Sequence, residues 1–227
     1  MMTGLISFIL TIVIYYGAKR CYARWPKVYL SPLLVTPVLL VAILTWTHLP
    51  YQAYNEGTRP LSYLLQPATV AFAIPLYKYS AVLKKHAVEI AAGVLSGSVA
   101  AVFSTALLGG WLHVNPQMIH SLIPHSVTTP IAMGVSERIG GVPTLTAVFV
   151  IITGLAGALI GPWLIRLLRI HSEVARGVLL GTSAHGAGTS KAFEISQVAG
   201  TISSISMILA ALITLCAAPW MASIPIP

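Results

Sequence analysis

The chain has 227 residues, of which 56% are hydrophobic and only 8% are charged. In soluble globular domains, roughly a quarter of all residues are charged. This composition therefore excludes an ordinary soluble protein and predicts an all-α polytopic membrane protein. The net charge of +8 does not indicate a nucleic-acid partner. Its basic residues form short clusters between apolar runs, where the positive-inside bias places them in membrane proteins.

The N-terminal part, residues 1–85, is predicted to be a scaffold of transmembrane helices. A first span over about residues 3–18 precedes the densest basic cluster of the chain, at 19–27, which indicates the cytoplasmic side. A second span is predicted over about 30–49, followed by a polar external loop at 50–60. A third span, 61–79, carries Pro67 and Pro75, each of which removes a backbone donor and kinks or interrupts a helix.

Three further spans are predicted in the rest of the chain. The first covers about residues 86–108 and follows Lys78, Lys84 and Lys85, which return the chain to the cytoplasm. The next covers about 143–168, and Arg166, Arg169 and Arg176 lie at or just beyond its end. The last covers about 200–221.

Two polar, helix-breaking stretches interrupt this apolar sequence, at residues 124–132 and 181–191. One constant interval aligns Ser126 with Ser183 and Glu137 with Glu194, which predicts two repeat units, 86–142 and 143–227. Irregular backbone at membrane depth is tolerated only where protein buries it or where it lines a cavity. A matched pair of such breaks points to the substrate site of a transporter.

The breaks have two possible topologies. If each is a re-entrant hairpin, the two hairpins enter from opposite faces, and residues 166–176 fall on the cytoplasmic side with 19–27 and 78–85. If each is a spanning helix with an unwound centre, the chain crosses the membrane eight times. The positive-inside bias favours hairpins and an inverted-repeat, transporter-like architecture.

Hydroxyl groups, glycines and histidines in the breaks are the candidate substrate-binding residues. Hydroxyls, together with unpaired N–H groups at the helix ends beyond each break, can bind an anion without a buried charge. Glycines allow close approach of the backbone, Pro130 frees a carbonyl, and the histidines could link uptake to protons. The candidates are His125, Ser126, Thr128, Thr129, Pro130, Ser183, His185, Gly186, Gly188 and Thr189.

Charged residues near the breaks have two interpretations. Glu137, Glu194 and Lys191 either couple transport to protons or substrate, or form structural ion pairs at the membrane interface. The sequence has no Asp, no metal-ligand spacing, no phosphate loop and no Ser–His–acid constellation. We therefore expect no enzyme activity, no cofactor and no metal site.

Several long motifs resemble the LrgB/CidB family of bacterial membrane proteins. They are Leu65-Gln66-Pro67-Ala68, Ser126-Val127-Thr128-Thr129-Pro130-Ile131-Ala132-Met133, Gly140-Gly141-Val142-Pro143 and Gly181-Thr182-Ser183-Ala184-His185-Gly186-Ala187-Gly188-Thr189. Members of this family commonly carry Lys at the position of His125. An anionic substrate would then be neutralised here by His125 itself or by Lys191.

The resemblance implies a multi-pass protein of the bacterial inner (cytoplasmic) membrane with a smaller LrgA/CidA-type membrane partner. It also implies kinship with the plastid glycolate/glycerate transporter. We therefore expect a homo-oligomeric transporter, or transport subunit, for small monocarboxylates such as pyruvate, glycolate, lactate or glycerate, with repeats that move in an elevator-like manner. The alternative implied by the family is antiholin-like control of murein hydrolase export and cell lysis.

Overall fold

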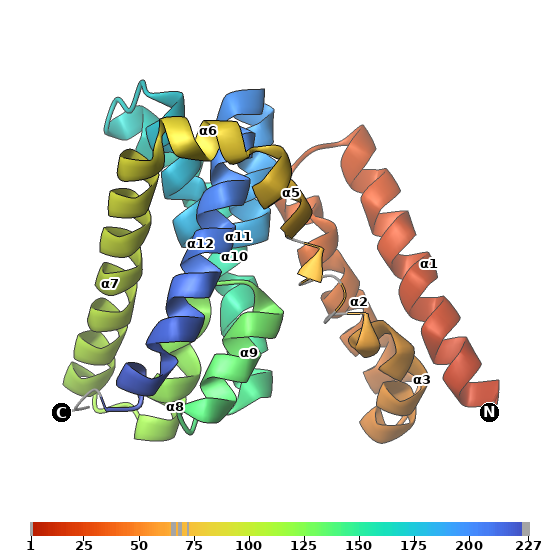
Figure 1. Ribbon diagram of the computed structural model, residues 1–227. Helices are drawn as coiled ribbons and strands as arrows, with labels where there is room; N and C mark the ends of the chain where they lie inside the picture. Colours follow the sequence, from red (N-terminus) through yellow and green to blue (C-terminus); the bar gives the residue numbers. More distant parts are fainter. Residues whose placement is uncertain (1, 65–66, 68–69, 72, 224–227) are drawn as a thin grey trace. The chain divides into compact units, whose positions relative to one another are not determined.

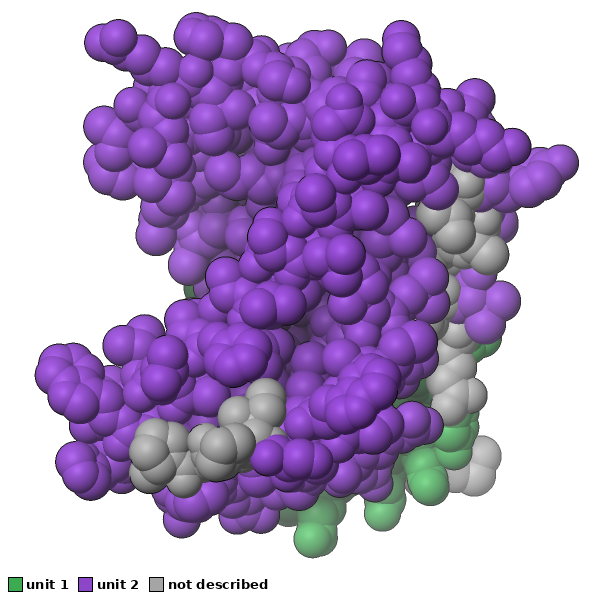
Figure 2. Space-filling view, turned by 60° about the vertical axis from the view of Figure 1, so that its left-hand side comes forward, with its two compact units in different colours: residues 1–68 green, residues 69–227 purple. Residues whose placement is uncertain are grey.

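The computed structural model describes residues 2–64, 67, 70–71 and 73–223, and all the regular structure in these ranges is helical (Figure 1). This confirms the predicted all-α class. The chain forms two compact units, Met1–Ala68 and Thr69–Pro227, called unit 1 and unit 2 below (Figure 2). The scaffold predicted at 1–85 and the repeat boundaries at 86–142 and 143–227 stay predictions.

Unit 1 consists of α1 (Met2–Arg24), η1 (Val28–Leu30), α2 (Pro32–Trp46) and α3 (Tyr51–Tyr63). The first helix contacts both of the others. Thr11 and Tyr54 share a hydroxyl–hydroxyl hydrogen bond of 2.8 Å. One turn further along α3, a Cβ added to Gly57 would lie 2.6 Å from the Cα of Gly4. Small residues thus bring α1 and α3 together.

One prediction for this region was wrong. Residues 50–60 are not a loop, because α3 begins at Tyr51 and places Tyr54 and Thr58 toward the interior of unit 1. The span predicted at 61–79, which its prolines were expected to kink or interrupt, is not one continuous helix, because α3 ends at Tyr63 and α5 begins at Ala73. Five residues of this span lie outside the described residues: 65, 66, 68, 69 and 72. They include three of the four residues of the family motif at 65–68.

Unit 2 contains the remaining helices. They are α5 (Ala73–Lys78), α6 (Ser80–Lys85), α7 (Ala87–Trp111), α8 (Pro116–Leu122), η2 (Ile123–Ser126), α9 (Thr129–Arg138), α10 (Pro143–Leu167), α11 (Glu173–Ile195) and α12 (Gln197–Met221). Within the described ranges, four helices are long and apolar enough to cross a membrane: α1, α7, α10 and α12. The last three agree with the predicted spans to within a few residues. At 15 residues, α2 is shorter than the roughly 20 that span a bilayer.

The core of unit 2 forms around α12. In the most apolar stretch of α12, 61% of the residues are buried, whereas the corresponding share is 33% in α7 and 28% in α10. Large side chains such as Phe103 on α7 and Ile152 and Trp163 on α10 are more than half exposed. Such continuous apolar surface is expected where helices contact lipid. α12 is therefore the central helix, and α7 and α10 present apolar faces to the bilayer.

The structure gives a test of topology. His86 and Glu89, at the start of α7, line one cavity with Ser172 and Val174, at the start of α11. The basic residues that precede each helix, 84–85 and 166–169, therefore lie near the same end of unit 2. From the positive-inside bias, we predict that this end is cytoplasmic.

An Arg169→Cys variant, made in a chain lacking Cys21 and Cys216, is expected to react with an impermeant maleimide in inverted membrane vesicles and not in intact cells. Leu112→Cys, in the turn after α7, should show the reverse pattern. Labelling of position 169 in intact cells would contradict the hairpin topology.

Candidate functional site

The first break is a short extended segment. After α8 and η2, Val127 (φ −120°, ψ 175°) and Thr128 (φ −62°, ψ 140°) are extended, and α9 then begins at Thr129. Pro130 lies in the first turn of α9, where its missing N–H removes no helical hydrogen bond. The predicted break at 124–132 is therefore narrower than expected, and Pro130 starts a helix rather than interrupting one.

The two limbs around this break form a hairpin. The Thr146 hydroxyl, on α10, lies 2.8 Å from the Ser121 carbonyl and 2.7 Å from the Ser136 hydroxyl. The Val142 N–H donates to Ser121 Oγ at 2.7 Å. Ser121 precedes the break and Ser136 follows it, so the limbs run antiparallel. The tip of this hairpin is at Val127 and Thr128.

A second hairpin lies within α11. His185 has φ 37° and ψ −122°, which divides the helix into limbs 173–184 and 186–195. Gly188 folds back so closely that an added Cβ would lie 3.0 Å from the Leu180 carbonyl carbon. The first hairpin follows the end of α7. The second hairpin follows the end of α10, and its first residues lie near the start of α7. The two hairpins therefore come from opposite ends of unit 2 (Figure 1).

The unusual backbone conformation of the second break belongs to His185 and not to the glycines. Gly186 and Gly188 were expected to supply it, but Gly140 is the sole glycine with positive φ in the described ranges. These angles lie in a region that normally only Gly adopts, so an L-residue there is strained by about 1–3 kcal/mol and persists only where its surroundings hold it. Here the His185 ring lies against Gly154 of α10, where an added Cβ would come 2.7 Å from Cε1.

This strain predicts an inverted order of stability for two truncations. In an ordinary helix, Ala is more stable than Gly by about 1 kcal/mol. At position 185 we expect His185→Gly to be more stable than His185→Ala by about 1 kcal/mol or more, because Gly accepts the backbone angles without strain. Thermal unfolding of the purified variants measures the difference. A more stable Ala variant would show that this backbone angle carries no strain.

A cavity of about 260 Å³ connects the two breaks. His125 and Ser126 line it from η2, and Thr182 and Ser183 line it from the first limb of α11. The remaining wall is formed by small or apolar residues of α7 and α11: Gly93, Gly97, Ala101, Val178 and Leu179. Polar groups from both hairpins therefore face one half-open cavity.

Three buried polar atoms near the breaks make no hydrogen bond within the described part of the chain. They are Thr128 Oγ1, Thr182 Oγ1 and His185 Nε2, and each residue is no more than 8% exposed. An unsatisfied buried polar group costs about 1–3 kcal/mol, so each one calls for a reason. Thr182 lines the cavity directly.

The other two lie where the hairpin tips meet α10. Val127, next to Thr128, packs in the same apolar cluster as Val150. His185 lies beside the Val150 carbonyl. Both tips therefore lie near the middle of α10.

The remaining predicted site residues divide into two groups. His125 is tied to the chain by a 2.9 Å contact between Nδ1 and the Leu122 carbonyl, and Ser183 donates to the Leu179 carbonyl at 2.7 Å. Both still line the cavity. By contrast, the Thr189 hydroxyl pairs with Ser203 of α12 at 2.9 Å, and Gly186 is exposed.

Sequence reasoning missed Thr182. A signal for it was available, because the interval that aligns Ser126 with Ser183 also aligns His125 with Thr182 and Thr128 with His185. The polar lining of the cavity is thus made of equivalent positions in the two halves.

The charged candidates lie away from the cavity. Lys191 Nζ and Glu194 Oε2 form an ion pair of 2.7 Å within one helical turn, and Glu137 is exposed at the end of α9. This geometry agrees with the structural interpretation of Lys191 and Glu194. In the described ranges, no group of three or more His, Cys, Asp or Glu side chains is placed to hold a metal ion.

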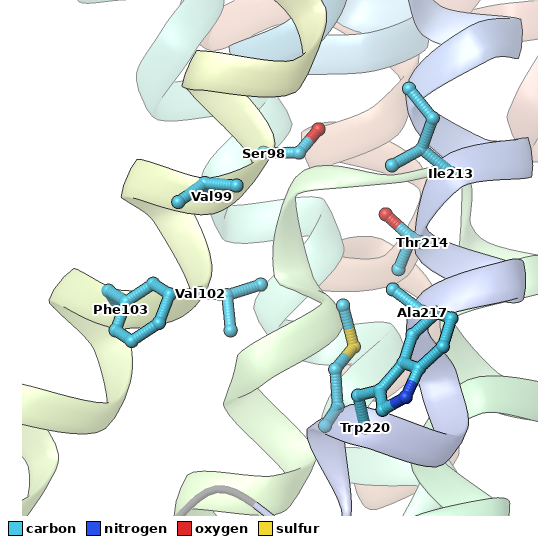
Figure 3. Close-up of a pocket in the computed structure, with 9 residues that line it drawn as sticks. Ser98, Val99, Val102, Phe103, Ile213, Thr214, Ala217 and Trp220 are labelled. Atoms are coloured by element: carbon cyan, nitrogen blue, oxygen red, sulfur yellow. The ribbon is translucent and has the colours of Figure 1, made fainter.

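A second cavity, of about 210 Å³, lies between α7 and α12 (Figure 3). Val99 and Phe103 on α7 face Ile213 and Trp220 on α12 across it. Its lining is apolar apart from the hydroxyls of Ser98 and Thr214. This cavity does not suit a small anion.

These features define a multi-pass α-helical membrane protein with a polar cavity between two broken helices. Residues 11–224 match the LrgB-like family, and the chain belongs to that family. It is 63% identical to Uncharacterized protein YwbG of Bacillus subtilis over 98% of this chain and 99% of that protein. It is 35% identical to Holin-like protein CidB of Staphylococcus aureus over 93% and 92% of the two chains. No solved structure matches it.

Proposed function

We propose that the protein is a transporter, or the transport subunit of one, for small monocarboxylates in the bacterial inner membrane. Pyruvate, glycolate, lactate and glycerate are the candidate substrates. The observation that carries the proposal is the cavity lined by His125 and Ser126 from one break and by Thr182 and Ser183 from the other. An apolar membrane chain has no packing reason to place polar groups at matched positions around a shared space.

The chemistry of the cavity suits a carboxylate. The Ser126 and Thr182 hydroxyls can each donate a hydrogen bond to it. The helices that follow Thr128 and His185 begin close in sequence to the lining residues Ser126 and Ser183. Their first turns carry backbone N–H groups without intrahelical partners and the positive ends of the helix dipoles. Such helix ends bind anions without a buried cation. Volume also favours a small solute, since about 260 Å³ is below the roughly 300–1,000 Å³ of drug-sized ligand sites.

The hairpins suggest how the solute moves. Each long helix, α7 or α10, is followed by its own hairpin, and the two hairpins come from opposite ends, which fits an inverted repeat with a site at its centre. Movement of this repeat pair against a scaffold would give alternating access. The N-terminal helices, a second copy of the chain and an LrgA/CidA-type partner are the candidate scaffold.

The alternative is a holin-like function, as the name of the staphylococcal relative suggests, with the control of membrane permeability and of murein hydrolase export that the family resemblance implies. That function acts through assembly of copies in the membrane. It requires no polar cavity at the repeat centre, which is why we favour transport.

Uptake of labelled pyruvate and glycolate into proteoliposomes, with and without the partner, separates the two functions. A transporter gives saturable uptake while an entrapped dye is retained. A holin-like protein gives dye release with no saturation by the carboxylate. The second result would overturn the proposed function.

A further inference from the structure

A larger cavity lies next to the one between the breaks. Its volume is about 420 Å³, and it is lined at the starts of α7 and α11 by His86, Glu89, Ser172 and Ala175. We call it the vestibule, and the cavity between the breaks the chamber. Three residues line both: Gly93, Val178 and Leu179. The two spaces are thus neighbours along the crevice between α7 and α11.

Glycines bring the two helices into contact between these spaces. A Cβ added to Gly93 would lie 2.6 Å from Val178 Cγ1, and one added to Gly97 would lie 3.0 Å from Thr182 Cγ2. The two glycines are one helical turn apart and face α11 in the same way. Where vestibule and chamber meet, the Val178 side chain packs against the bare backbone of Gly93, and Leu179 is the other side chain that lines both spaces.

The polar groups along the crevice indicate a route for a polar solute. His86 and Glu89 form a 3.5 Å pair that lines the vestibule. At the other end, the unpartnered Thr182 hydroxyl is buried and lines the chamber. Apolar close packing alone would leave neither a polar vestibule nor an unsatisfied hydroxyl behind it.

We propose that vestibule and chamber are two parts of one solute path, and that the contact of Val178 with Gly93 is the constriction that limits the size of solute reaching the chamber. This assignment rests on the proposed function for the identity of the solute. In this path, Val178 and Gly93 determine the size of solute that can pass, and neither residue belongs to the two breaks. The path begins at the end of unit 2 that carries Lys84 and Lys85.

Thiol labelling tests the path without any measurement of transport. In a chain lacking Cys21 and Cys216, Ser126→Cys reports on the chamber and Ala175→Cys on the vestibule. The probe is a methanethiosulfonate bearing a quaternary ammonium, applied to inverted vesicles. Its fixed charge restricts it to aqueous routes.

Val178→Ala is expected to raise the labelling rate of Ser126→Cys by about tenfold, and Val178→Phe to lower it by about tenfold, each equivalent to roughly 1.4 kcal/mol in the barrier to passage. The labelling rate of Ala175→Cys should not change when Val178 is substituted, because the vestibule lies outside the constriction. If the Phe variant fails to fold, the Ala variant alone decides, since it removes atoms at a half-buried site.

Labelling of Ser126→Cys that is indifferent to Val178, or that proceeds faster from the opposite side, would overturn the path. The outcomes for path and function can be told apart. Labelling controlled by Val178 without saturable uptake would keep the path and reject monocarboxylate transport. Saturable uptake with labelling indifferent to Val178 would keep transport and reject this constriction.

Discussion

Replacing Ser126 by Ala and Thr182 by Val together is expected to abolish saturable monocarboxylate uptake at ordinary substrate concentrations. Both side chains line the chamber, and the two substitutions remove its proposed hydroxyl donors with little change of shape. A hydrogen bond to a charged group is worth about 1.5–3 kcal/mol, so the pair would lower affinity by roughly a hundredfold or more. Uptake titrations in proteoliposomes, with each single variant measured beside the double variant, give this value.

The same substitutions should not destabilise the protein. The Thr182 hydroxyl makes no hydrogen bond within the described part of the chain, so its removal loses no bond and removes an unsatisfied buried group. Ser126 is only half-buried. Thr201→Val is the matched control, because Thr201 is equally buried but donates to the Gln197 carbonyl within α12. Its uptake should stay at the wild-type level. Unchanged uptake in the double variant would place the site elsewhere.

Gly181→Ala is expected to destabilise unit 2 strongly. A Cβ at this position would lie 2.9 Å from the Ser203 Cα, so helices α11 and α12 would have to separate. Backbone cannot move aside as a flexible side chain can, and overpacking of this kind costs about 1–3 kcal/mol or more. Thermal unfolding of the purified protein in detergent measures the loss.

Gly134→Ala provides the comparison, because an added Cβ at Gly134 meets nothing within 4 Å. Inside α9, Ala should stabilise the helix by about 1 kcal/mol relative to Gly. Equal unfolding temperatures for the two variants would mean that α11 and α12 are not packed as closely as the structure shows.

The long helices of unit 2 could be predicted because a single property determines them. A run of about 20 apolar residues is long enough for the bilayer, and α7, α10 and α12 begin and end close to where hydropathy changes. Helix α3 was missed for the opposite reason. Its residues are polar enough to resemble a loop, and only contacts with α1, such as the bond of Tyr54 to Thr11, show why they are helical.

The location of the breaks followed from polar composition, but their geometry did not. Sequence favours glycine for unusual backbone angles, whereas the structure has them at His185, next to Gly154 on another helix. Contacts between distant segments decide such a feature. For the same reason, the contribution of Gly93 and Gly97 to the chamber wall was not visible in the sequence.

An experimental structure of the protein with pyruvate or glycolate at saturating concentration would show whether a carboxylate binds between the two broken helices. We expect solute density in the chamber, with the carboxylate within hydrogen-bonding distance of Ser126 and Thr182. An empty chamber under these conditions, with the solute bound in another cavity, would contradict it.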